Sequence, residues 1–332
     1  MKHLIIFAMV FLLLIVSCSV VAQERGLKAV GKASAELSDM IYRQGWALVI
    51  GINKYPQLPP QYQLRYSEAD AEGIASLLQR EFGFEKTSIT ALKGERATKQ
   101  GILDALASFT NPNRVQKDDC VLIYFSGHGQ TVSLPESRGG GKMGFLVPYD
   151  ARVDLSQEPN AEQYYRYCIG MDELSRTAKL IPAKHILFIV DACYSGLVLR
   201  ATRGFDVKIP GYLTKAASVP TQQMITAGGE GEESQESSDY GHGVFTYKLI
   251  EGLDKGVADN NNDGVITSWE LASYLSGYVP QIAPQNPQFG REGEGEFLFL
   301  PQEGGKTEKV QETIPEKVVE LDNMAKLYVD SE

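Results

Sequence analysis

The sequence predicts an α/β fold: a mostly parallel sheet of about six strands with helices on both faces. Two observations support this expectation. Short, almost wholly apolar segments have the composition of strands buried on both faces, at residues 46–52, 119–125 and 185–190. Segments with helical spacing of apolar residues alternate with them, at 67–82, 97–109 and 171–180. Alternation of this kind is typical of a parallel sheet whose crossover connections are helices.

The elements follow in chain order. In the helix expected at 67–82, Ala71, Ile74 and Leu78 recur on one face, and Ser67 is a plausible N-cap. A short strand is expected at 87–92. The second half is less regular, with a loop at 200–220, a short strand at 223–227 and a mobile, solvated loop at 228–240 that is rich in Gly, Glu and Ser. Helices at 244–253 and 268–275 and a last strand at 296–300 complete the domain, and a charged tail covers 302–332.

Length and charge restrict the class of protein. The chain has 332 residues, of which 43% are hydrophobic and 22% are charged, which is enough for one large domain with appendages. The formal net charge is −10, with no cluster of Lys and Arg. Phosphate binding requires such a cluster, so nucleic acid is not expected as a partner.

The first 22 residues have the pattern of an export signal. A basic start precedes an apolar run of 13 residues at 4–16, which is short for a bilayer span and typical of a signal peptide. Two processing sites compete: cleavage after Ala22, or a lipobox ending in Cys18, which would then carry lipid. The expected location is the periplasm or the exterior, or the outer membrane if Cys18 is lipidated. Residues 23–44 are expected to be a connector, and membrane contact is expected only through the signal or lipid.

Beyond Cys18, the cysteines are Cys120, Cys168 and Cys193. An odd number of thiols in an exported protein leaves one unpaired and points to a reactive cysteine. Cys120 opens an apolar strand and is interpreted as a buried small residue. Whether Cys120 and Cys168 pair is left open.

Two of the apolar strands lead directly into polar motifs. One is followed by SGHG at 126–129 and the other by DACYSG at 191–196. The carboxyl ends of parallel strands line the ligand crevice, so His128 and Cys193 are expected to meet as base and nucleophile. An adjacent imidazole activates a thiol that is otherwise mostly protonated. Backbone amides of Gly129 and Cys193 are candidates for the oxyanion site, and Gly127 is expected to serve the turn.

These motifs, in this order and strand context, resemble the catalytic core of the caspase superfamily, in particular bacterial metacaspase-like proteins of peptidase type C14. The resemblance covers residues 45–301 and includes WALVIGINKY at 46–55 and GFLVPYD at 144–150. It implies a caspase-like three-layer sandwich, with a large-subunit-like part at 45–205 and a small-subunit-like part at 221–301. It also implies a cysteine endopeptidase acting through a His–Cys dyad.

One departure from true caspases bears on specificity. Caspases usually have glutamine two residues before the catalytic cysteine, whereas this chain has Asp191. In metacaspases the matching aspartate lines an acidic pocket, with help from an aspartate of the first helix and the serine of the histidine motif. The resemblance therefore assigns Asp191, Asp70 and Ser126 to a pocket for Arg or Lys, and it implies protein or peptide substrates with a basic P1 residue. The alternative for Asp70 is a solvated helix face.

Other interpretations remain open. His242, before the helix at 244–253, is a rival base, whereas His185 opens a strand and is interpreted as structural. The chain could instead be a catalytically silent caspase-like interaction module, or another Cys–His hydrolase on an α/β scaffold. The acidic segment at 230–239 is interpreted as a solvated connector, with a lid as the alternative.

A second motif, DNNNDGVITSWE at 259–270, satisfies the twelve-residue EF-hand pattern. Its expected Ca²⁺ ligands are Asp259, Asn261, Asp263, Val265, Thr267 and Glu270. The alternative is an Asx-rich turn that caps the following helix without metal. The peptidase chemistry itself needs no cofactor.

Overall fold

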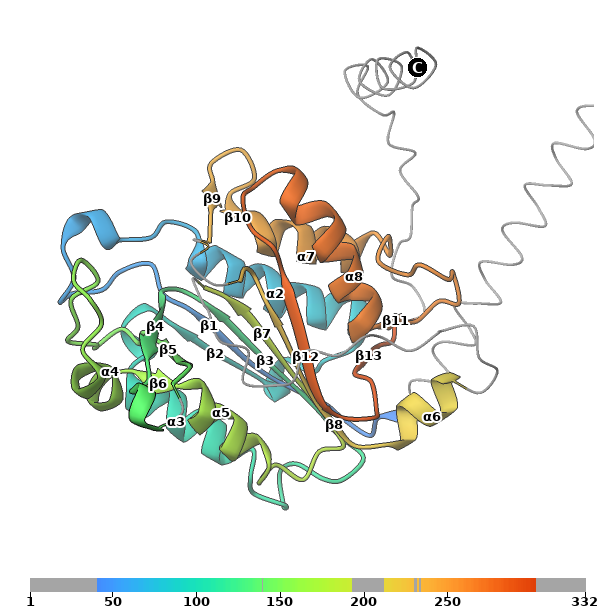
Figure 1. Cartoon of the computed structure of the whole chain (residues 1–332). Helices are drawn as coiled ribbons and strands as arrows, with labels where there is room; N and C mark the ends of the chain where they lie inside the picture. The colour runs from blue at the N-terminus through green and yellow to red at the C-terminus, as the bar shows by residue number, and fades with distance from the viewer. Residues whose placement is uncertain (1–40, 139, 193–211, 230–231, 233, 303–332) are drawn as a thin grey trace, which may run out of the picture.

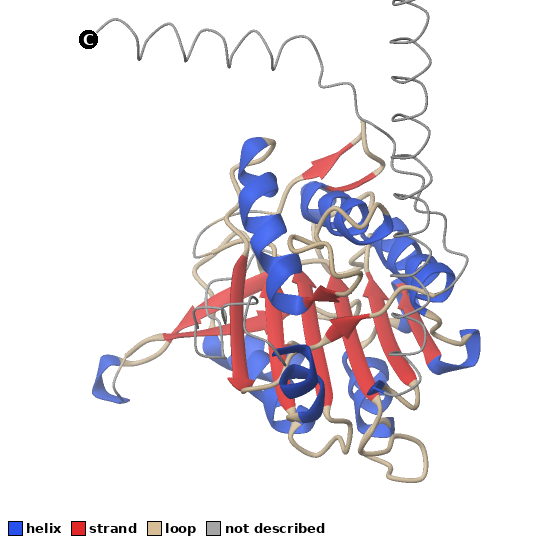
Figure 2. Cartoon of the chain, turned by 90° about the vertical axis from the view of Figure 1, so that its right-hand side faces the viewer, coloured by secondary structure: helices blue, strands red, loops and turns tan. Residues whose placement is uncertain are grey.

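The computed structural model describes residues 41–138, 140–192, 212–229, 232 and 234–302. A six-stranded sheet lies at its centre, in the order β12-β8-β7-β3-β1-β2 (Figures 1 and 2). The neighbouring strands run parallel except for β12, which pairs antiparallel with β8 at one edge. The strands are β1 (Gly45–Gly51), β2 (Ile89–Lys93), β3 (Cys120–Ser126), β7 (His185–Asp191), β8 (Thr221–Thr226) and β12 (Gln288–Gly293).

Helices cover both faces of this sheet (Figure 1). One face carries α2 (Ser67–Phe82), α7 (Val244–Asp254) and α8 (Ser268–Tyr278), and the other carries α3 (Lys99–Ser108) and α5 (Met171–Ala178). Alternate residues of each strand enter separate cores: in β1, Leu48 packs in the α3 and α5 core and Val49 in the opposite one. The expected three-layer α/β sandwich with a mostly parallel sheet is confirmed.

The described residues also form three smaller sheets outside the central one. A three-stranded sheet contains β4 (Gly129–Ser133), β5 (Lys142–Leu146) and β6 (Ile169–Gly170). Two pairs are formed by β9 (Glu236–Ser237) with β10 (His242–Gly243), and by β11 (Ile266–Thr267) with β13 (Leu298–Phe299). The other helices within the described residues are α4 (Ala161–Tyr167), α6 (Tyr212–Ser218) and the 3-10 turns at Pro60–Tyr62, Lys86–Ser88, Gly94–Arg96, Glu136–Arg138 and Val279–Gln281.

Several local expectations are wrong. Helix α6 occupies part of the segment expected to be a loop at 200–220. The edge strand β12 is not among the elements expected from the sequence. The last strand expected at 296–300 is present as the shorter β13, which pairs with β11. Ser67 is the first residue of α2 and is buried, while the N-cap is Tyr66, which makes no side-chain cap. These differences arise where tertiary contacts, and not periodicity, decide the local structure.

Two further observations concern the described residues alone. No helix among them is long and apolar enough to cross a membrane. The signal segment, Cys18 and the charged tail from residue 303 onward lie outside the described residues. Of the connector, residues 41–44 are described, and Arg43 forms an ion pair with buried Asp119.

Candidate active site

The two motifs expected to be catalytic follow neighbouring strand ends. Strands β3 and β7 are parallel neighbours, and their register pairs Ser126 with Asp191 at the carboxyl edge of the sheet. The backbone N–H of Gly127 donates to the carbonyl of Asp191 over 3.2 Å. His128 follows Ser126 by two residues, and Cys193 follows Asp191 by two. Cys193 itself lies outside the described residues.

The imidazole of His128 is oriented by a backbone carbonyl. Its Nε2 lies 2.6 Å from the carbonyl oxygen of Tyr62, and because a carbonyl only accepts, Nε2 must donate. In the neutral ring the basic lone pair is therefore on Nδ1. The backbone N–H of His128 donates to the hydroxyl of Tyr55 over 2.8 Å, and the two rings pack with centroids 5.0 Å apart. Sequence reasoning identified no third group, and it missed both tyrosines.

The glycines around His128 have different roles. A Cβ on Gly127 would lie 2.6 Å from the hydroxyl of Tyr55, so the close approach of that tyrosine requires glycine here. Gly127 does not adopt a positive φ, so the space that Tyr55 occupies, and not a left-handed backbone, accounts for glycine at this position of the turn. Gly129 begins β4, is buried, and pairs with Leu146 of β5.

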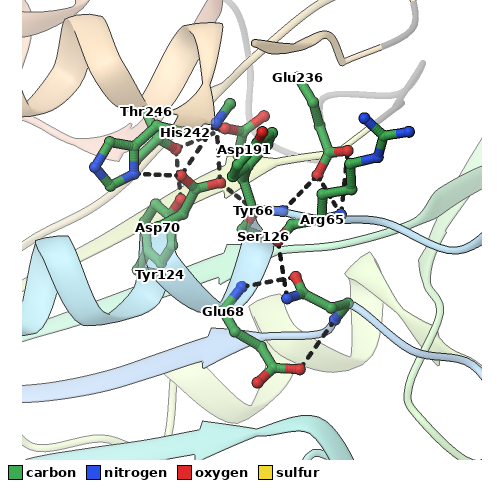
Figure 3. Close-up of polar contacts among 12 residues, drawn as sticks. Arg65, Tyr66, Glu68, Asp70, Tyr124, Ser126, Asp191, Glu236, His242 and Thr246 are labelled. Atoms are coloured by element: carbon green, nitrogen blue, oxygen red, sulfur yellow. Dashed lines mark hydrogen bonds and ion pairs between the residues drawn. The ribbon is translucent and has the colours of Figure 1, made fainter. Parts of the chain in front are cut away.

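Asp70 and Asp191 come together in the interior at the carboxyl edge (Figure 3). Asp70 lies in the first turns of α2 and is 1% exposed, and Asp191 ends β7 and is 3% exposed. Asp70 accepts hydrogen bonds from the Ser126 hydroxyl over 3.0 Å and from Nδ1 of His242 over 2.8 Å. The solvated-helix alternative for Asp70 is therefore wrong, and the structure brings Asp70, Ser126 and Asp191 into one cluster.

Helix α7 points its amino terminus at both carboxylates. A Cβ on Gly243, the N-cap, would lie 2.7 Å from Oδ2 of Asp191 and 3.2 Å from Oδ2 of Asp70. The N–H of Gly243 donates to Asp70 over 3.1 Å, and the hydroxyl of Thr246 donates to Asp191 over 2.6 Å. The hydroxyl of Ser234 also donates to Asp191. The positive end of a helix stabilises negative charge at such a position. Sequence reasoning missed these donors, because short polar residues near a helix start resemble ordinary caps.

Burial makes these carboxylates hard to ionise. It raises the pKa of Asp191 to about 7, with the nearby Asp70 carboxylate as the second cause, against the hydrogen bonds from Ser234 and Thr246. Burial also raises the pKa of Asp70, against hydrogen bonds from His242 and Ser126. Among the described residues, His242 contacts Asp70, but no Lys or Arg forms an ion pair with either carboxylate.

The acidic segment is partly built into this region. The carboxylate of Glu236 accepts hydrogen bonds from the backbone N–H groups of Arg65, over 2.9 Å, and Tyr66, over 2.8 Å (Figure 3). These residues lead from Tyr62 into α2. A purely solvated connector is therefore wrong for this stretch, since Glu236 and Ser234 both hold parts of the site.

The other thiols and the third histidine are poor candidates for catalysis. Cys120 and Cys168 are both free and buried. Burial raises the pKa of the Cys168 thiol to about 12 and that of Cys120 still further from its usual range. His185 is buried against the hydroxyl of Tyr42, 2.5 Å away, and burial lowers its pKa to about 3. It has the structural role that its strand position predicts.

Comparisons with known proteins agree with this architecture. A family model described as the caspase domain, Peptidase_C14, matches residues 44–270. The crystal structure of protein GSU0716 from Geobacter sulfurreducens is similar in fold, with a TM-score of 0.50 and 21% sequence identity over 78% of this chain and 97% of that chain. No curated protein matches the chain. The family match covers most of the chain and indicates a cysteine-peptidase type of activity on protein substrates. This chain therefore belongs to the caspase-domain family of peptidases.

Proposed function

We propose that the protein is a cysteine endopeptidase that hydrolyses peptide bonds after Arg or Lys. The observation that carries this proposal is the pair of buried carboxylates, Asp70 and Asp191, with no Lys or Arg partner among the described residues. Buried carboxylates normally have a cationic partner, because desolvating an unpaired charge is costly. A guanidinium or ammonium group of a substrate supplies the missing charge, and an acidic P1 side chain would be repelled.

The pocket adjoins the catalytic strand ends. Asp191 precedes Cys193 by two residues, and Ser126, which donates to Asp70, precedes His128 by two. A P1 side chain that reaches the carboxylates therefore leaves its own carbonyl near the two motifs that follow. This arrangement links the specificity pocket to the chemical step.

The proposed reaction uses His128 as base and then as acid. Nδ1 of His128 takes the proton from the Cys193 thiol, and the thiolate sulfur attacks the carbonyl carbon of the scissile bond. The N–H groups of Gly129 and Cys193 stabilise the oxyanion that forms. When the C–N bond breaks, Nδ1–H gives its proton to the leaving amine and a thioester remains. Water, deprotonated by Nδ1, then attacks the thioester and releases the acid and the Cys193 thiol.

The carbonyl of Tyr62 supports both steps. It accepts the proton-bearing Nε2 and so keeps the neutral ring in the tautomer that has Nδ1 as base. When the ring is protonated during the attack, the same carbonyl stabilises its positive charge. No buried carboxylate is needed for this role.

Peptide substrates and an active-site label test the proposal. Cleavage of otherwise identical peptides with Arg, Lys, Asp or Leu at P1 should occur only after Arg and Lys. A peptide electrophile with Arg at P1 should label Cys193 alone. Cys193→Ala and His128→Ala should each lower kcat/KM by at least about 10³-fold while the protein stays folded. His242→Gln should lower it less.

Three results would contradict the proposal in different ways. Preference for Asp or Leu at P1 would show that Asp70 and Asp191 do not form a pocket for basic P1 residues. No cleavage and no labelling by a folded protein would favour a catalytically silent interaction module. A larger loss of kcat/KM in His242→Gln than in His128→Ala would show that His242, and not His128, is the general base.

We also propose that the protein is exported by its first 22 residues, which lie outside the described residues. The support is the basic start and the apolar run at 4–16. The mass of the mature amino terminus distinguishes the two processing sites: a chain beginning at Gln23 shows ordinary cleavage, and a diacylated Cys18 shows a lipoprotein. Full-length unprocessed protein in the cytoplasm would contradict export.

A further inference from the structure

The loop between α7 and α8 has a motif that the proposed peptidase reaction does not use. Its donor residues stand at loop positions 1, 3, 5, 7, 9 and 12, namely Asp259, Asn261, Asp263, Val265, Thr267 and Glu270. The exit helix α8 begins at Ser268, directly after position 9. Helix α7 ends at Asp254, so residues 255–258 separate it from the loop, and the amino-terminal side departs from a plain helix–loop–helix.

The backbone folds tightly around position 1. Asn262 and Gly264 both have positive φ, of 57° and 84°. The carboxylate of Asp259 accepts hydrogen bonds from the N–H groups of Gly264, over 2.9 Å, and Asp263, over 3.2 Å. This turn draws the first half of the loop around the Asp259 side chain, with glycine at the position where the EF-hand pattern requires it.

Glu270 is the observation that points to a ligand. It is 1% exposed, and its Oε2 accepts hydrogen bonds from the N–H and the hydroxyl of Thr267, each over 3.0 Å. Its Oε1 is buried and has no hydrogen-bond partner. Burying a carboxylate oxygen without a partner costs free energy, so this atom is expected to bind a cation or to accept a hydrogen bond.

The charges around Glu270 have the same sign. Asp259, Asp263 and Glu270 bring three carboxylates into a twelve-residue loop that contains no Lys or Arg. Carboxylates in one short loop repel one another, and a divalent cation between them would remove the repulsion.

The rest of the fold holds the second half of the loop in place. Ile266 pairs with Phe299 of β13, and Val265 and Ile266 are each 1% exposed. Thr267 and Glu270 form a capping box at the start of α8. The positions that carry the last ligands are thus fixed by the core, which lowers the conformational cost of binding an ion.

We propose that residues 259–270 bind one calcium ion, with Glu270 as the bidentate ligand and oxygen atoms of Asp259, Asn261, Asp263, Val265 and Thr267 as the others. The donor set contains only oxygen, and half of it is uncharged, which suits Ca²⁺ better than Zn²⁺. Within the described residues, no group of three or more His, Cys, Asp and Glu side chains is clustered as a metal site. The proposed site contains three carboxylates, so calcium binding must draw Asp259, Asp263 and Glu270 closer together than they lie in this structure, while amide, hydroxyl and backbone oxygens complete the ligand set.

Calcium titration of the purified, chelator-treated protein tests this inference. We expect one binding event by calorimetry, and a melting temperature that rises by about 5 °C at calcium concentrations about 100 times Kd. Mg²⁺ at the same concentration should raise it much less. Glu270→Gln should abolish both effects, because glutamine preserves the capping box but not the bidentate carboxylate. Asp263→Asn, in an exposed position, should weaken binding without disturbing the fold.

The control is Glu294→Gln, which removes an acid that pairs with Lys215 outside the loop and should leave the calcium effects unchanged. An unchanged melting curve and no heat of binding at about 5 mM calcium, which exceeds the Kd range of about 0.1–1 mM for extracellular calcium modules, would overturn the inference. Calcium effects that persist in both Glu270→Gln and Asp263→Asn would place the ion elsewhere. Neither result bears on the peptidase proposal, because the readouts are heat and melting temperature.

Discussion

Two sets of buried acids in the described residues differ in their partners. Asp119, at the amino end of β3, is bound by Arg43 over 2.7 Å, and Glu296, before β13, is bound by Arg291 over 3.0 Å. At the carboxyl edge, Asp70 and Asp191 are equally buried, yet among the described residues no Lys or Arg binds either of them. Their hydrogen bonds come from hydroxyl groups, a backbone N–H and His242.

The difference distinguishes structural acids from acids that receive a substrate. An arginine that neutralises a buried acid makes the acid part of the folded core. A carboxyl group held by neutral donors keeps a raised pKa and can still gain a cation from outside. The four predictions below challenge or refine this distinction.

The largest effect is expected where a balanced pair is broken. Arg291→Met leaves the carboxylate of Glu296 buried without its cation and should lower the free energy of unfolding by about 3 kcal/mol, measured by chemical denaturation. Arg176→Met is the control, because Arg176 and Asp172 form an exposed pair worth under about 0.5 kcal/mol. Equal losses in the two variants would show that the Glu296 pair is no different from a surface pair.

Asp191→Asn should act on catalysis instead. It removes the charge that binds the P1 cation and should lower kcat/KM for Arg peptides by about 100-fold or more, with little loss of stability. Asp119→Asn should do the opposite, reducing stability by about 1–3 kcal/mol and leaving kcat/KM unchanged. A stability loss without a catalytic loss in Asp191→Asn would make Asp191 a structural acid like Asp119.

The raised pKa of Asp191 predicts a pH dependence. Between its usual pKa near 3.8 and about 7, the folded protein keeps a proton on Asp191 that the unfolded chain has released. The contribution of this group to the free energy of unfolding therefore falls as pH rises through that window. Arg substrates need the ionised form, so the ratio of kcat/KM for Arg to kcat/KM for uncharged citrulline at P1 should rise about tenfold per pH unit below pH 7.

The ratio is informative because titration of His128 and Cys193 changes kcat/KM equally for both substrates. Their pH dependence therefore cancels in the ratio, and only the titration of the pocket remains. A ratio that stays constant from pH 5.5 to 8 would show that Asp191 is already ionised or does not contact P1.

The smallest effect concerns one neutral donor. Thr246→Val removes the hydroxyl that donates to Asp191 and lies 2.5 Å from the hydroxyl of Tyr124. Loss of this donor should raise the pKa of Asp191 further, move the midpoint of the Arg-to-citrulline ratio to higher pH and lower kcat/KM for Arg about fivefold at pH 7. Thr177→Val, whose hydroxyl donates to a backbone carbonyl of α5, is the control. If the pH midpoint of the Arg-to-citrulline ratio does not move, Thr246 does not influence the ionisation of Asp191.

The regular half of the fold could be predicted from the sequence. The apolar spacing of Ala71, Ile74 and Leu78 places α2 at its observed bounds, and the continuous apolar runs locate β1, β3 and β7. Strand β12 could not be predicted, since its sequence QFGREG has one buried position and owes its conformation to pairing with β8. Helix α6 could not be predicted for the same reason. It is short, and contacts with segments distant in the sequence, such as the hydrogen bond from Glu296 to Ala216, hold it in place.

The sequence by itself determined which described side chains stand at the carboxyl edge, because parallel strands end on the same side, Asp191 ends β7 and His128 follows the end of β3 by two residues. Only the tertiary structure decided what surrounds them. The carbonyl that orients His128 belongs to Tyr62, and a backbone carbonyl has no identity in a sequence. The burial of Asp70 against Gly243, with no arginine among the described residues bound to it, depends on the packing of α2 against α7. Charge balance is a property of neighbours in space, and the folded chain alone chooses them.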